Sequence, residues 1–219
     1  MSTSVTFTKQ LAAASSTNIA TSQSGTAATP LTLNGSAVSN GVATIDTSSA
    51  ANTAIGRRVT ISYTGTDTSF AIVGTNATGN AITDTAVGSG GTAQSNLDFV
   101  TVTSITPVGG GLTGVTAGTN SVGSSQWVPF NWRGYAPMNI GVAVELVSGA
   151  ANFTIQHTYD DPNGLPPGVL YPLAFNSTLI SGATGTVEGP YVTPIKAARL
   201  LINSGTGELR TRFLQAGAG

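Results

Sequence analysis

The only histidine in the chain, His157, is the first residue whose type could perform chemistry. A serine nucleophile needs such an imidazole as its base, together with an acid that orients the ring. The chain has no Gly-x-Ser-x-Gly motif, which presents the nucleophile in many hydrolases. His157 instead follows Phe153 and Ile155 at every second position, and this alternation predicts one face of a strand. We therefore expect a structural histidine and no enzymatic activity.

Two adjacent carboxylates, Asp160 and Asp161, could ligate a hard cation such as Ca²⁺ through their oxygens. They precede Pro162-Asn163-Gly164, a group of turn-forming residues, and aspartates in turns commonly accept hydrogen bonds from backbone amides. No EF-hand spacing surrounds the pair, and the glycine-rich runs match no phosphate-binding motif. The sequence therefore predicts a turn here, with no bound metal and no cofactor.

Four aromatic side chains within nine positions form the candidate binding site of the sequence. They are Trp127, Phe130, Trp132 and Tyr135. Flat aromatic faces with polar edges suit stacking against sugars, so a glycan-binding platform is one interpretation. The favoured interpretation is a core plug or a subunit interface, where Trp and Tyr are enriched. Val128 and Pro129 are interleaved with the rings, and a strand is expected shortly afterwards.

Charged residues make up only 8% of the 219-residue chain, whereas an ordinary soluble domain has roughly 25%. Hydrophobic residues make up 40%, which is enough for a core. An uncharged polar surface has little desolvation penalty when a partner covers it. We therefore expect much of this surface to be buried in an assembly, with copies of the same chain as one partner. A free β-rich secreted domain is the alternative.

Several classes of partner are not expected. The net charge is −1, and Arg57-Arg58 is the only adjacent basic pair, so nucleic-acid binding is not predicted. No apolar run approaches the ~18 residues of a membrane span. Cysteine is absent, which excludes disulfides. The N-terminal residues lack the pattern of a secretory signal, so we expect a protein that is made in a cytoplasm and used as synthesised.

Alternating apolar residues recur along the chain and predict an all-β protein. Residues 138–161 are expected to form two strands joined by a turn at Ser148-Gly149-Ala150, and residues 199–214 a second such pair. Two antiparallel parts resembling β-sandwiches or jelly rolls are predicted, at 51–107 and 126–219. An N-terminal arm or small meander (1–50) precedes them, and a Gly/Thr/Ser-rich linker (108–125) joins them.

Two blocks of strand and turn residues are distinctive. The first combines Gly56–Ile61, Gly74–Ala81 (GTNATGNA) and Phe99–Ile105 (FVTVTSI). The second combines Phe153–Asp161 (FTIQHTYDD), Ala198–Gly207 (ARLLINSGTG) and the ending Leu214-Gln215-Ala216-Gly217. The first block resembles a module of tailed-bacteriophage structural proteins, and the second is similar to the C-terminal half of small virion proteins, often from short-tailed phages.

The resemblance implies a virion component that is assembled in the bacterial cytoplasm and carries no catalytic motif. A capsid decoration (cement) or head-fibre protein is the expected function, acting through protein–protein contacts with itself and with capsid proteins. A neck or tail component is the alternative within this class. A carbohydrate-binding or adhesin module that uses the aromatic cluster is the alternative from another class.

Overall fold

The computed structural model describes residues 3–45, 55–131, 139–165 and 171–215. Within these ranges the protein consists of β-strands and contains no helix, which confirms the all-β prediction. The chain divides into two compact units. Unit 1 takes the described parts of residues 3–11 and 124–215, and unit 2 takes those of 12–45 and 55–123.

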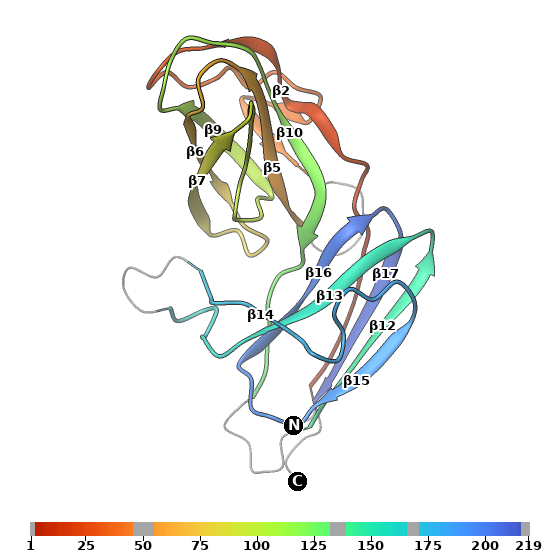
Figure 1. Ribbon diagram of the computed structural model, residues 1–219. Coiled ribbons are helices and arrows are strands. Elements are labelled where there is room, and N and C mark those ends of the chain that lie inside the picture. Colours follow the sequence, from red (N-terminus) through yellow and green to blue (C-terminus); the bar gives the residue numbers. More distant parts are fainter. Residues whose placement is uncertain (1–2, 46–54, 132–138, 166–170, 216–219) are drawn as a thin grey trace. The chain divides into compact units, whose positions relative to one another are not determined.

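Unit 1 is a sandwich of two antiparallel sheets (Figure 1). Sheet A has the strand order β1-β17-β12-β15, and sheet B has β14-β13-β16 with β11 paired to β16. The bounds are β1 Thr3–Lys9, β11 Val128–Pro129, β12 Ile140–Ser148, β13 Ala151–Thr158, β14 Phe175–Asn176, β15 Val187–Tyr191, β16 Ala197–Gly205 and β17 Glu208–Gln215. Phe130, just after β11, lies edge-on to Phe213 of sheet A with 5.6 Å between ring centroids. The two inner faces therefore share a core.

Both pairs of strands predicted in this unit exist, but neither pair is a hairpin. β12 pairs with β15 and β17, whereas β13 pairs with β14 and β16. The short reversal at Gly149 (φ 71°) therefore carries the chain from one sheet to the other, and the β16–β17 connection does the same. We call a reversal that joins two different sheets an arch. A hairpin and an arch have the same alternation and the same turn residues, because each joins two strands that bury one face.

The N-terminal residues are not a separate arm. β1 pairs with β17 along its whole length, from Thr3 opposite Gln215 to Lys9 opposite Leu209. Phe7 is buried there, with its ring centroid 6.2 Å from that of Phe213. The prediction treated residues 1–50 as one segment because it could not anticipate a pairing between the two ends of the chain.

Unit 2 forms an antiparallel sheet of nine strands in the order β2-β10-β5-β8-β7-β6-β9-β4-β3. The bounds are β2 Ser15–Gly25, β3 Val38–Ser39, β4 Val42–Thr44, β5 Gly56–Thr64, β6 Ser69–Thr75, β7 Ala81–Ser89, β8 Thr92–Gln94, β9 Thr101–Pro107 and β10 Leu112–Ser124. Strands β5, β6, β7 and β9 lie within the antiparallel β part predicted at residues 51–107.

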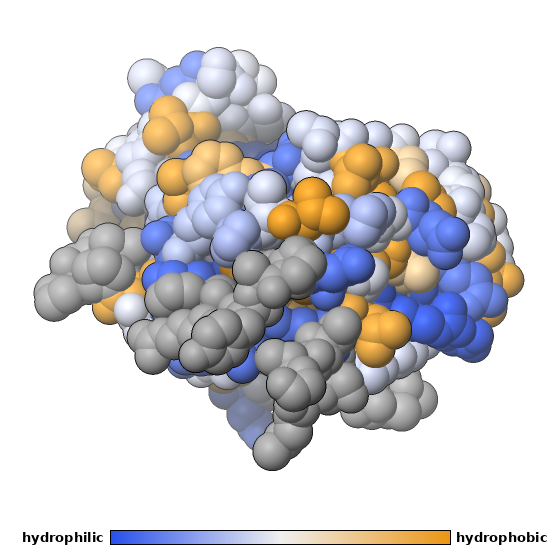
Figure 2. Space-filling view, turned by 90° about the horizontal axis from the view of Figure 1, so that it is seen from below, coloured by the Kyte–Doolittle hydropathy of each residue, from blue (hydrophilic) through white to orange (hydrophobic). Residues whose placement is uncertain are grey.

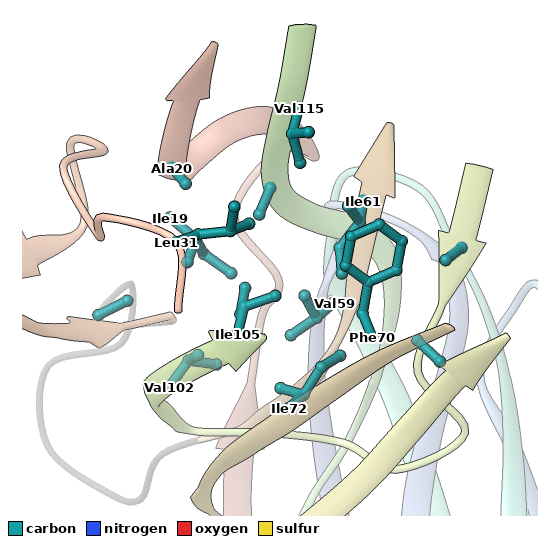
Figure 3. Packing of buried hydrophobic residues seen from close by; sticks show 14 of the residues in the cluster. Ile19, Ala20, Leu31, Val59, Ile61, Phe70, Ile72, Val102, Ile105 and Val115 are labelled. Carbon is teal, nitrogen blue, oxygen red and sulfur yellow. The ribbon is translucent and has the colours of Figure 1, made fainter. Parts of the chain in front are cut away.

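The core of unit 2 draws side chains from almost every strand. Ile61 of β5, Phe70 and Ile72 of β6 and Ile105 of β9 are fully buried. Figure 3 shows these residues pointing toward one another, with Ile19 and Leu31 closing the same cluster from the N-terminal part of the chain. Residues before position 50 are therefore part of this core, which corrects the predicted boundary at residue 51.

The predicted linker at 108–125 is also corrected, because it contains β10. This strand pairs with β2 through a register interrupted by bulges, and Leu112 and Val115 are buried. The linker was predicted because glycine- and threonine-rich stretches are typical of flexible connections. Here the close approach of β2 needs a small residue, since a Cβ on Gly118 would overlap the backbone of Ser15.

Candidate functional site

The most distinctive group of side chains lies where β13 ends at the edge of sheet B. His157 is opposite Phe175 of the short edge strand β14 on one side and Ala198 of β16 on the other. Tyr159 follows two positions later, just beyond the strand. Antiparallel pairing thus places residues 157–159 beside Phe175, although 16 or more positions separate them along the chain.

Three aromatic rings surround the imidazole. The His157 ring stacks on Phe175 at a centroid distance of 5.8 Å and an interplanar angle of 24°. Tyr159 and Tyr191 approach it edge-on at 5.5 Å and 5.3 Å. Tyr159 also contacts Phe175 at 5.7 Å. We call these four residues the His157 cluster.

The outer part of the His157 cluster is open to solvent. Tyr159 is 51% exposed and Phe175 41% exposed, whereas Tyr191 is buried beneath them. Leu173 is exposed as well, and its backbone N–H donates to Oδ2 of Asp160, the residue after Tyr159, at 2.8 Å. Of the eleven large hydrophobic residues exposed in the described chain, six lie between positions 159 and 192. Solvent-facing rings packed on a buried base are typical of a binding surface.

The contacts of His157 indicate a packing role. Its Nδ1 lies 3.3 Å from the hydroxyl oxygen of Tyr191, and among the described residues it makes no hydrogen bond to a carboxylate. Burial lowers the pKa of His157, which favours the neutral imidazole. Burial also raises the pKa of Tyr191. A neutral ring without an orienting acid lacks the geometry of a catalytic triad.

The two aspartates beside this cluster organise the turn. Asp160 accepts the hydrogen bond from Leu173, and Oδ1 of Asp161 accepts one from the N–H of Asn163 at 2.9 Å. Asp161 also accepts a bond through its backbone oxygen from the N–H of Gly164 at 3.1 Å. Within the described ranges, no three His, Cys, Asp or Glu side chains are grouped so as to hold a metal ion.

The aromatic cluster proposed from the sequence is only partly described. Phe130 is buried against Phe213, as the core interpretation expects. Trp127 lies under the guanidinium of Arg199, 4.6 Å from the ring centroid, and Arg199 also donates to Gln156 at 2.9 Å and to Ser124 at 3.0 Å. One face of the Trp127 ring is therefore already occupied. Trp132 and Tyr135 lie outside the described residues.

Sequence reasoning missed the His157 cluster as a site. Tyr159 continues the alternation of Phe153, Ile155 and His157, so its place beside the histidine could have been inferred. Phe175 and Tyr191 reach the cluster through strand pairing and sheet packing, which no local pattern encodes.

On the face shown in Figure 2, hydrophobic groups form separate orange areas between pale areas of intermediate hydropathy and blue ones. This pattern agrees with a chain that is poor in charged residues.

No protein-family model matches the sequence, and a comparison with curated proteins finds no significant match. Within the described ranges, no helix has the length and apolar character that would span a membrane.

Proposed function

We propose that the protein is a non-enzymatic structural component of a tailed-phage virion. It acts as a capsid decoration (cement) or head-fibre protein, and a head protein is the partner that covers the His157 cluster. The exposed pair Tyr159 and Phe175 is the observation that carries this proposal. Tyr and Phe are enriched in the cores of protein interfaces, where a few rigid rings supply most of the binding energy.

The base of the His157 cluster supports a docking role because it is already ordered. The imidazole packs against both exposed rings and against the buried Tyr191, so little side-chain entropy is lost when a partner binds. The low charge of the chain favours the same role, since few ions must be desolvated in a large contact. The resemblance of residues 153–161 to phage virion proteins includes His157 and Tyr159.

Two alternatives use the same surface. A neck or tail protein would bind a different virion partner through the same rings. A carbohydrate-binding module, the alternative from another class, would stack a sugar on the exposed rings of Tyr159 and Phe175.

The experiment is co-sedimentation of the purified protein with isolated heads and with isolated tails of the phage that encodes it. We expect the wild type to sediment with heads and the Tyr159→Ser/Phe175→Ser double variant to lose at least tenfold in affinity. The matched control is Val147→Ser, which removes a 39% exposed apolar side chain from the same unit, outside residues 159–192, and should bind as the wild type does.

The other outcomes each decide between functions. Binding to tails alone identifies a neck or tail component. Binding to neither particle, with binding of soluble glycans that the double variant loses, identifies a carbohydrate-binding module. Equal head binding by the wild type and the double variant removes the His157 cluster from the proposal.

A further inference from the structure

The outer face of sheet A carries an open hollow of about 510 Å³. Gly141 and Ala143 of the central strand β12 form its floor. Leu214 and Arg212 of β17 border it on one side, and Pro190 and Glu188 of β15 border it on the other. A methyl group added at Gly141 would meet only ordinary contacts, at 3.8 Å or more, so the floor is low because the residue is small.

The strand register arranges these residues in two rows across the sheet. In the first row Arg212 is opposite Ala143, and Ala143 is opposite Glu188. In the second row Leu214 is opposite Gly141, and Gly141 is opposite Pro190. Each row therefore has a small residue in the middle and a larger residue about 5 Å away on either side, the spacing of neighbouring strands.

The charges of the first row differ across the groove. Glu145 forms ion pairs with both Arg210 and Arg212, with N–O distances of 3.3 Å and 3.0 Å. One carboxylate thus serves two guanidiniums, which leaves excess positive charge on the β17 side. Glu188 makes no ion pair among the described residues and leaves negative charge on the β15 side.

We propose that this face binds a second copy of the chain about a two-fold axis parallel to β12. Such an axis exchanges the two sides of the groove. It brings Arg212 of each copy over Glu188 of the other, and Leu214 over Pro190. Gly141 and Ala143 then face their own counterparts, where small residues let the two sheets pack closely. A two-fold interface repeats each contact twice, so one complementary row supplies two ion pairs.

The pairing is tested on the isolated full-length protein, by light scattering coupled to size-exclusion chromatography. We expect the wild type to have the mass of two chains. Arg212→Glu and Glu188→Arg should each have the mass of one chain, because each places like charges together twice. An equimolar mixture of these two variants should recover the dimer mass, because every pair in the mixed dimer is again Arg with Glu.

The control is Arg210→Gln. Arg210 lies outside both rows, and its loss leaves Glu145 paired with Arg212 at 3.0 Å, so this variant should remain dimeric. A monomeric wild type, dimeric single variants, or a mixture of monomeric variants that fails to pair would each overturn the proposal. Head binding plays no part in this assay, so its result is independent of the proposed virion role.

Discussion

His157 links the packing of the candidate site to a measurable pH dependence. Its folded-state pKa is lowered by burial, whereas an unfolded histidine has a pKa of about 6.5. Between these values the unfolded chain binds more protons than the folded one, so the free energy of unfolding falls as the pH falls. The chain has one histidine, and carboxylates titrate mostly lower, so the interval from about pH 7 to 5 reports this side chain.

We expect the urea midpoint of the wild type to be lower at pH 5 than at pH 7. The variant His157→Phe keeps an aromatic ring between Tyr159 and Phe175 but cannot titrate, so its midpoint should change less over the same interval. Terminal groups titrate equally in both proteins and cancel in the comparison. An equal pH dependence in the two proteins would show that His157 titrates alike when folded and unfolded.

Gly74 shows how a single residue can determine strand pairing. It lies in β6 opposite Val102 of β9, next to an irregularity in the register. A Cβ at this position would overlap the carbonyl oxygen of Thr101, which is backbone and cannot move without breaking the pairing. Position 79 favours glycine for a different reason. Its φ is 82°, in the left-handed region, whereas a methyl group there would meet no described atom within 4 Å.

The two glycines give a matched pair of variants. Gly79→Ala should cost about 1 kcal/mol, the penalty for a side chain in the left-handed region. Gly74→Ala should cost at least twice as much, because the β6–β9 pairing must shift. Chemical unfolding followed by circular dichroism measures both. Equal losses would mean that β6 and β9 separate easily to admit the methyl group.

At the level of the strands, the sequence predicted positions well and pairings poorly. Alternation located β12, β13, β16 and β17, since a half-buried strand must alternate. Which strands hydrogen-bond is a long-range property, and so the arches β12–β13 and β16–β17 read as hairpins. The seven-residue pairing of β1 with β17 has no local signal at all.

Two Asn-Gly dipeptides illustrate the same limit. Asn40 and Gly41 have φ values of 52° and 77°, and they form the tight turn between β3 and β4 that this dipeptide predicts. Asn34-Gly35 is the same dipeptide, but it does not join two paired strands. The side chain of Asn34 instead accepts hydrogen bonds from the N–H and hydroxyl of Thr21, at 2.8 and 2.9 Å. A tertiary contact with β2 has replaced the local preference.

The candidate site, too, could be predicted from the sequence only in part. The packing roles of His157 and Phe130 could be predicted from the types and spacing of their neighbours. The exposed rings of the His157 cluster could not, because three separate strands and a loop bring them together.

For the whole molecule, the order of the chain implies that unit 2 is inserted into unit 1. β1 belongs to unit 1, and among the described residues the chain next enters that unit at residue 124. Every member of the buried cluster of unit 2 lies between Ile19 and Ala117, and β2 to β10 pair in one continuous order. A segment that contains its own core and its own pairing partners meets the requirements for an independent domain.

We therefore expect residues 12–123, expressed alone, to unfold cooperatively. Ile72 and Val73 of β6 provide the internal test, since Ile72 is fully buried and Val73 is 38% exposed. Ile72→Ala should cost about 2–5 kcal/mol in the fragment and the same in the full chain, because all its packing partners are present in both. Val73→Ala should cost less than half as much in either. A fragment that unfolds without cooperativity, or that responds equally to both variants, would mean that the core of unit 2 forms only with the rest of the chain.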